Sequence, residues 1–160
     1  MNSKIQTGNL SRVKPLHDEF VLSIKQPWAE LIISGRKDVE VRSWATNYRG
    51  PLWIHTGKNP DSYAAKRFQL GELFMGGIIG YVELWGIRPL CAKSWEAWRS
   101  RHKDNAPFDE QLAKYGWILR NPKRLKEPVS VKGTTGIFKL PESVRNRLRI
   151  PPEARLSQDR

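Results

Sequence analysis

The chain has 160 residues, which fits one domain, and it carries 28 Lys and Arg against 16 Asp and Glu, a net charge of +12. Apolar residues make up 39% of it and include seven Trp, enough for one core without a disulfide or a metal. The single Cys91 excludes an internal disulfide and a multi-cysteine zinc site, and no apolar run is long enough to cross a bilayer.

The basic charge predicts a polyanionic partner, most often nucleic acid, because neutralised phosphates release counterions. A second interpretation remains open, in which the charge only keeps the protein in solution. The polar segment Met1–Pro15 has no apolar stretch of the kind found in signal peptides, so we expect a cytoplasmic protein without a membrane partner.

The first half of the chain begins with residues 1–17, which lack periodicity and are expected to form a flexible N-terminal arm. The apolar run Phe20–Ile24 predicts a strand, and a helix of about two turns is expected over 27–34. Gly35 is suited to end that helix, and the alternation at 39–42 predicts a second strand.

Further elements follow at regular intervals. We expect a strand at Leu52–Thr56, a helix capped by Asn59, a long strand at Ile78–Ile87 and a helix capped by Ser94. The remaining predicted strands are Trp117–Leu119, Val129–Val131 and Gly136–Leu140. Between the first two of these lies a predicted basic loop with Arg120, Lys123, Arg124 and Lys126, which is either a rim for phosphate groups or a solvated linker.

This order of elements predicts an α+β fold: a small mixed β-barrel of about six strands with short flanking helices. The predicted domain spans residues 18–142. Residues 143–160 are rich in Arg and interrupted by Pro, and we expect them to form a basic, partly disordered tail.

One segment places three charges together. Gly35 ends the helix, Lys37 lies in the turn, and Glu40 and Arg42 project from one face of the next strand. Arg as a planar fork, Lys as a mobile charge and Glu as an acceptor would suit a base edge or a phosphate. From spacing alone, a solvated strip of ion pairs on an edge strand is the other interpretation.

The string G-x-K-x-x-E-x-R formed by these residues resembles the signature of the ASCH (activating signal cointegrator homology) family. That family has the PUA-like β-barrel fold, which it shares with RNA-binding modules. Flanking blocks extend the resemblance over about residues 20 to 141. These blocks are Leu22–Ala29, Tyr48–His55, Gly80–Leu84, Trp117–Leu119 and Gly133–Phe138.

The resemblance implies an RNA- or nucleotide-binding protein whose G-x-K-x-x-E-x-R segment lines the ligand cleft. Some small members resemble amidohydrolases of acylated cytidine, and others resemble ribonucleases, so a hydrolase is the alternative function. In the amidohydrolase pattern a lysine is catalytic, a threonine is the nucleophile and a later glutamate assists. Lys37 matches the lysine, Glu40 stands at the threonine position, and Glu83 is the candidate for the later glutamate.

The expected ligand is RNA, in single-stranded form, or a nucleotide-like small molecule; no cofactor and no metal is expected, since the three histidines lack metal-ligand spacing. Trp28 is placed either in the core or against a base. The candidate binding residues are Lys25, Gln26, Trp28, Lys37, Glu40, Arg42, Trp44, Tyr48, Arg49, His55 and Lys58. The oligomeric state is not determined by the sequence.

Overall fold

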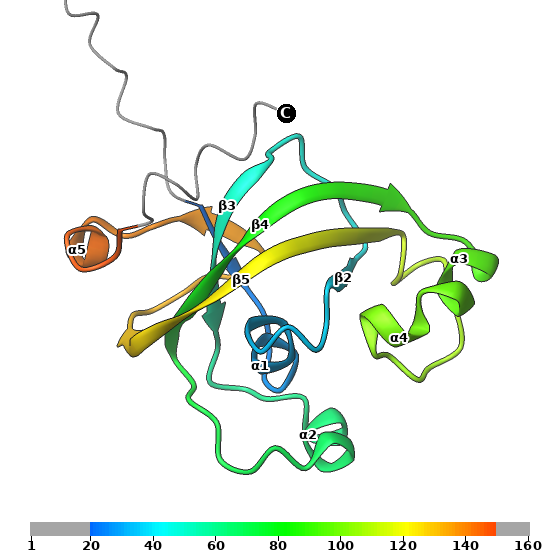
Figure 1. The fold of residues 1–160 in the computed structure, drawn as a ribbon, viewed down its shortest axis with the longest axis horizontal. Helices are drawn as coiled ribbons and strands as arrows, with labels where there is room; N and C mark the ends of the chain where they lie inside the picture. The colour runs from blue at the N-terminus through cyan, green and yellow to red at the C-terminus, as the bar shows by residue number, and fades with distance from the viewer. Residues whose placement is uncertain (1–19, 150–160) are drawn as a thin grey trace, which may run out of the picture.

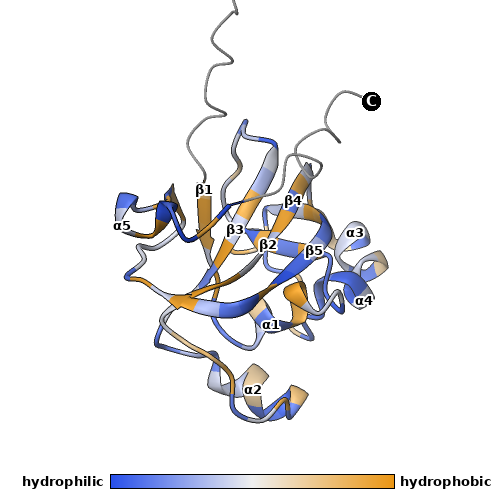
Figure 2. Ribbon diagram, turned by 60° about the vertical axis from the view of Figure 1, so that its left-hand side comes forward, coloured by the Kyte–Doolittle hydropathy of each residue, from blue (hydrophilic) through white to orange (hydrophobic). Residues whose placement is uncertain are grey.

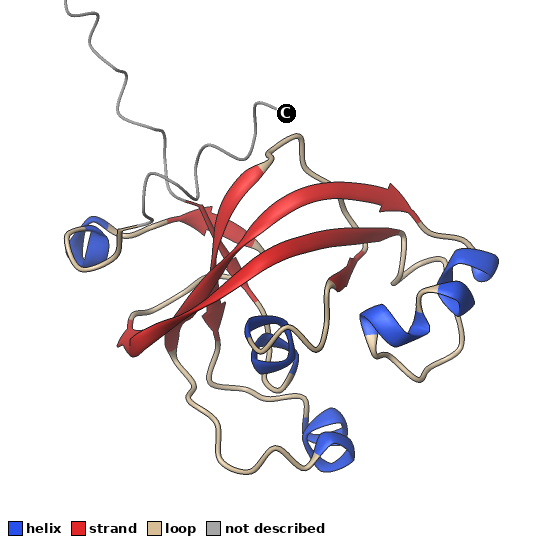
Figure 3. Cartoon of the chain, in the orientation of Figure 1, coloured by secondary structure: helices blue, strands red, loops and turns tan. Residues whose placement is uncertain are grey.

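The computed structural model describes residues 20–149, and its centre is a curled sheet of mixed strand directions with short helices around it (Figures 1 and 3). The six strands of the sheet are β1 (Phe20–Ser23), β2 (Val39–Arg42), β3 (Gly50–Thr56), β4 (Gly77–Pro89), β5 (Tyr115–Ser130) and β6 (Ile137–Lys139). The helices in this range are α1 (Trp28–Ile33), α2 (Ser62–Phe68), α3 (Ala92–Ala97), α4 (Arg99–His102) and α5 (Glu142–Arg145).

The strands follow the order β2-β5-β4-β3-β1-β6, with β1 and β3 parallel and the other neighbouring pairs antiparallel. The long β4–β5 ribbon has register shifts at Ile78/Gly80, Tyr81/Glu83 and Leu84/Gly86. Such irregularities increase local twist and bend a ribbon. The sheet therefore curls into a half-barrel, which confirms the predicted small mixed barrel and its number of strands.

Two apolar clusters cover the two faces of this sheet, because successive residues of a strand point to opposite sides. On β1, Leu22 belongs to the inner cluster, while its neighbour Val21 belongs to the outer one. On β3, Leu52 and Trp53 divide in the same way. The helix α1 lies inside the curl against β3, β4 and β5, and the apolar residues concentrate on the strands (Figures 1 and 2). Within residues 20–149 no helix is both long and apolar enough to span a membrane.

The segment predicted as two strands around a basic loop is instead the single strand β5. Its two prolines suggested a loop because proline cannot donate to a ladder. Pro122 lies where β5 has one residue more than β4 between the pairs Tyr81/Lys123 and Glu83/Arg120, and Pro128 lies in a second irregular stretch. Both prolines therefore occupy places where a ladder donor is not required, and the basic residues lie on the ribbon.

Two helix starts also differ from the prediction. Asp61, rather than Asn59, caps α2, and its carboxylate accepts from the backbone N–H of Ala64 at 3.0 Å. Cys91 is the N-cap of α3, and Ser94, predicted as the cap, lies at the third helical position and accepts from the Cys91 N–H. In both places a nearby residue takes the capping position, so the helix begins at a different residue from the one predicted.

Residues 143–149, assigned by the sequence to the basic tail, pack against the sheet. The helix α5 starts at Glu142, and Val144 and Leu148 are buried in the outer cluster with Trp53. The arginines of this stretch concealed its apolar spacing, in which Val144 and Leu148 are four residues apart. The predicted arm 1–17 and residues 150–160 lie outside the described residues.

Replacing Leu148 with Ala should therefore lower the free energy of unfolding by about 2–4 kcal/mol, because the side chain is fully buried in the outer cluster. Denaturant unfolding followed by tryptophan fluorescence measures this loss. The exposed neighbour Arg149→Ala is the control and should change it by less than about 0.5 kcal/mol. A Leu148→Ala effect as small as that of the control would contradict the packing.

Candidate functional site

The junction between α1 and β2 is fixed by backbone geometry. Gly35 has φ +79°, the left-handed conformation that favours glycine, and its N–H bonds to the Ile32 carbonyl. The N–H of Lys37 then bonds to the Leu31 carbonyl at 2.9 Å. The chain thus turns sharply out of the helix and enters β2 with the Lys37 side chain directed inward.

Lys37 is buried, with 4% of its surface exposed, and its ammonium has three acceptors. Nζ donates to the carbonyls of Val39 at 2.6 Å and His102 at 2.7 Å, and it lies 3.4 Å from Glu40 Oε2. Burial lowers the pKa of Lys37, and the neighbouring Glu40 carboxylate opposes that effect. Because the ammonium is committed to these acceptors, Lys37 positions Glu40 and joins the junction to α4.

Glu40 and Arg42 point to the same side of β2, as the alternation predicts. Glu40 Oε1 lies 3.4 Å from Arg42 Nε, and Arg42 Nη2 donates to the Ser23 carbonyl on β1 at 2.7 Å. Among residues 20–149, Arg42 Nε is buried without a hydrogen-bond partner, and the Glu40 carboxylate is the anion that lies beside it. The three charges predicted from the spacing therefore lie in one row, with Glu40 in the middle.

Two adjoining concavities open beside this row. The larger, which we name the motif cleft, has a volume of about 390 Å³. Its lining consists of Ser23, Ile24, Lys25, Trp28, Glu40, Val41, Arg42, Gly57, Lys58, Asn59 and Thr135. The smaller, named the acidic chamber, has a volume of about 130 Å³. Its lining consists of Trp28, Lys37, Glu40, Val41, Asp61, His102 and Asp104.

Trp28 forms the wall shared by the two concavities. Its indole N–H donates to Asp61 Oδ2 at 3.0 Å, and Lys37 Nζ lies 5.2 Å from the centre of its ring. Burial raises the pKa of Asp61, but hydrogen bonds from the Ala64 N–H and the Trp28 indole outweigh this, so its pKa is lowered. The indole is half-buried, so the two interpretations of Trp28 both apply: it packs against the core and also borders the cleft.

Several predicted site residues lie elsewhere. Gln26 is buried, and its amide donates to the Phe74 carbonyl and accepts from the Glu30 N–H, so it holds backbone rather than ligand. Glu83 lies between Val82 and Leu84 of the inner cluster, so it occupies the opposite face of β4 from that cluster. There it accepts from Asn121 at 2.9 Å, away from Lys37 and Glu40.

Three predicted binding residues after β2 lie away from the two concavities, and the two aromatic ones pack against the sheet. Trp44 meets Trp117 edge to face at 4.8 Å, and Tyr48 meets Phe20 at the same distance. Arg49 is exposed and donates to loop carbonyls. None of these three predicted residues lines the motif cleft or the acidic chamber, because the chain turns back onto the inner cluster directly after Arg42.

His55 borders a third concavity next to the motif cleft and connects to the cleft through Ser23. Its Nε2 lies 2.8 Å from the Val131 carbonyl, which can only accept, so Nε2 carries the proton. Nδ1, 3.1 Å from Ser23 Oγ, accepts from that hydroxyl. Burial lowers the pKa of His55 more than the Val131 hydrogen bond raises it, so the ring is neutral.

The sequence did not identify part of the lining. Asp61 lies directly before α2, Asp104 lies in the loop after α4, and Thr135 lies in the loop before β6, so the fold brings them to the site. The Asp61-Ser62 pair, a recognisable helix start, was the one available signal. Within residues 20–149 no group of His, Cys, Asp and Glu is arranged to hold a metal ion.

Replacing Lys37 with Met should lower the free energy of unfolding by about 3 kcal/mol, because it leaves the Glu40 carboxylate and two carbonyls without their buried donor. Chemical denaturation measures this loss. The exposed Arg36→Met is the charge-matched control and should have little effect. Adding Glu40→Gln to Lys37→Met should cost less than the sum of the single changes; strict additivity would contradict the coupling.

Acidification should weaken the fold, because burial lowers the pKa of both His55 and His102. The unfolded chain takes up these protons below pH about 6.5, the ordinary histidine value, while the folded chain does not. Stability is therefore full above this pH and falls as the pH drops below about 6.5 towards the lowered pKa of each folded-state histidine, by up to about 1.4 kcal/mol per pH unit for each histidine.

Unfolding titrations across that range, for the wild type and for His55→Gln, measure the two contributions. In the variant, the free energy of unfolding should fall with decreasing pH only by the amount that His102 contributes. Equal slopes would mean that His55 has the same pKa in both states.

The comparisons with known proteins bear on the family and the fold. The model of the ASCH domain family matches residues 22–139. Activating signal cointegrator 1 of Mus musculus is 29% identical over 139 residues and that of Homo sapiens 28%; each match covers 78% of this chain and 23% of the relative. The chain thus spans about a quarter of the length of these curated relatives.

Solved structures give the same fold. A single-residue variant of an ASCH protein from Zymomonas mobilis superimposes with a TM-score of 0.61 at 15% identity, over 82% of this chain and 96% of the other. The unsubstituted Zymomonas mobilis protein gives a TM-score of 0.59 at 16% identity, over 79% and 90%. With the family model covering most of the described domain, the chain belongs to the ASCH domain family.

Proposed function

We propose that this ASCH domain binds single-stranded RNA, with one nucleotide in the motif cleft. The observation that carries the proposal is the position of Glu40. Its carboxylate is fixed between Lys37 and Arg42 and borders a cleft whose rim carries the exposed Lys25 and Lys58. An oriented acceptor within a basic rim is the combination that a base and its phosphate require.

The rim supplies the part of binding that does not depend on base identity. Lys25 and Lys58 are exposed and line the cleft from the loop after β1 and from the loop after β3. Exposed ammonium groups of this kind neutralise phosphates and release counterions. The +12 charge of the whole chain adds attraction at longer range, which raises the encounter rate with a polyanion.

The walls supply the part that depends on the base. Trp28 presents an aromatic ring of the kind on which bases stack. Glu40 can only accept, so it favours bases with an exocyclic amino group over uracil, whose single base donor is the ring N3–H. A cleft of about 390 Å³ admits an unpaired base but not a duplex, which favours single strands.

A hydrolase is supported less well. The Lys37 ammonium is committed to two carbonyls and Glu40, so it has no proton to exchange with a substrate without losing buried hydrogen bonds. Glu83, the candidate assisting glutamate, lies on the other side of β4. With Lys37 committed and Glu83 distant, the residues around the motif cleft favour binding over bond cleavage.

Binding of a labelled RNA decamer, measured by fluorescence anisotropy at rising salt, tests the proposal. The joint change Lys25→Ala and Lys58→Ala should weaken binding about tenfold and reduce the salt slope by about 1.4, the share of two single-strand phosphates. Oligo(C) and oligo(A) should bind more tightly than oligo(U).

The matched control is the double variant Lys123→Ala with Lys126→Ala, which removes the same charge from exposed positions on β5. It should reduce affinity much less, since neither residue lines the cleft. Equal losses in the two double variants, or no binding at low salt, would refute the proposal.

A further inference from the structure

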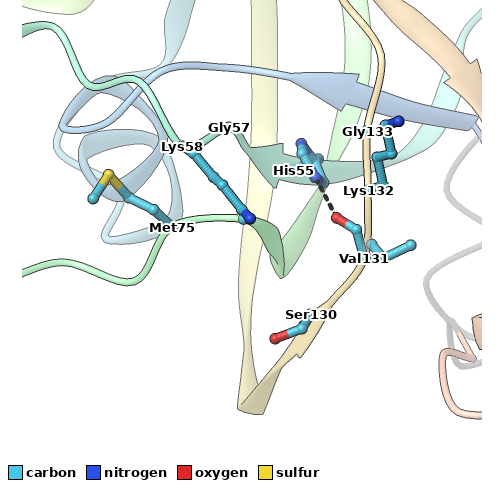
Figure 4. A pocket seen from close by; sticks show the side chains of 9 residues that line it. His55, Gly57, Lys58, Met75, Ser130, Val131, Lys132 and Gly133 are labelled. Carbon is cyan, nitrogen blue, oxygen red and sulfur yellow. Dashed lines mark hydrogen bonds between the residues drawn. The ribbon is translucent and has the colours of Figure 1, made fainter.

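A third concavity, with a volume of about 670 Å³, is larger than the motif cleft. We name it the glycine-lined cavity; it is seen from close by in Figure 4. Its lining consists of His55, Gly57, Lys58, Met75, Gly76, Ser130, Val131, Lys132 and Gly133. These residues come from the end of β3, the segment before β4 and the segment after β5, so no stretch of sequence indicated the cavity.

The cavity continues the motif cleft. Gly57 and Lys58 line both, so the acidic chamber, the motif cleft and the glycine-lined cavity follow one another along the molecule. In Figure 4 the Lys58 side chain extends across the opening between Met75 and Val131. A molecule that leaves the motif cleft past Lys58 therefore enters the cavity.

Its surface is suited to an anion and to sugar or base. Lys58, Lys132 and the Ser130 hydroxyl are donors, and none of the residues that line it is acidic. Met75 is 42% exposed and offers an apolar contact. The glycine-lined cavity therefore differs in charge from the acidic chamber, which lies on the other side of the motif cleft.

Glycine lets the backbone pack closely at this cavity. A Cβ at position 133 would lie 2.4 Å from the His55 ring, so glycine is needed for the loop after β5 to approach that ring, and Gly76 has φ +83°, which favours glycine. The backbone thus forms part of the wall, and a ligand can approach it closely. His55 lies between the motif cleft and the glycine-lined cavity and holds their walls together, because it bonds Ser23 of the cleft and Val131 of the cavity.

We infer that the glycine-lined cavity binds the next phosphate and nucleotide of the strand whose first base occupies the motif cleft, with Lys58 between the two and Lys132 beyond. The ligand class is then an oligonucleotide of at least two nucleotides, and neither a nucleoside nor a mononucleotide fills the site. This inference rests on the proposed function, which concerns the motif cleft alone.

Titration calorimetry with cytidine oligonucleotides of one to four nucleotides tests the inference. Affinity should rise about tenfold with the nucleotide that reaches the cavity, the gain expected of one more stacked and phosphate-bound unit. Lys132→Ala should reduce binding of the trinucleotide about threefold to fivefold and leave binding of the mononucleotide unchanged. Lys25→Ala, which changes the motif cleft only, should weaken both.

Amide chemical shifts give a readout that needs no variant. A mononucleotide should move the signals of Lys25 and Arg42, whereas Lys132 and Gly133 should move only with the longer strands. Movement of both groups with the mononucleotide would overturn the inference.

Three further results separate the possible explanations. Equal affinity at every length, with Lys25→Ala still weakening it, would overturn the inference and leave the proposed function standing. No binding at any length would overturn both. Cytidine 3′,5′-bisphosphate or inorganic phosphate that occupies the cavity as tightly as the trinucleotide does would show a site for a single phosphate group, which overturns the oligonucleotide class.

Discussion

The buried ammonium of Lys37 is the contact on which the arrangement of the site depends. Removing a charge from water is costly unless it is paired and fully hydrogen-bonded, and here the carbonyls of Val39 and His102 and the Glu40 carboxylate meet that need. These partners belong to β2 and to the end of α4. A bidentate pair between Asp38, the residue before β2, and Arg101 of α4 reinforces this connection, so the orientation of Glu40 depends on how α4 docks.

Curvature of the sheet completes the site. In the strand order β2 and β1 are separated by β5, β4 and β3, yet Arg42 of β2 donates to the carbonyl of Ser23 on β1. A flat sheet would keep these strands far apart. The motif cleft thus spans the mouth of the half-barrel, whose curl comes from the register shifts of the β4–β5 ribbon, distant in sequence.

The local part of this arrangement was predictable, and the long-range part was not. Gly35 and the alternation of Glu40 and Arg42 gave the junction because helix termination and strand period are properties of a few neighbouring residues. Trp44 and Tyr48 are equally close to the motif in sequence, but packing against Trp117 and Phe20 decided their direction. The glycine-lined cavity depends on three separate segments meeting, which no local pattern encodes.

The row of charges on β2 also affects the protein's behaviour at high concentration. β2 is the outermost strand on its side of the sheet, and outermost strands expose unpaired backbone groups that can recruit a second chain. Inward-facing charges on such a strand disfavour that pairing, because a neighbour stacked in register would bury them without partners. Glu40 and Arg42 therefore also disfavour aggregation through the exposed edge of β2, and a ligand that covers these two residues would shield the edge further.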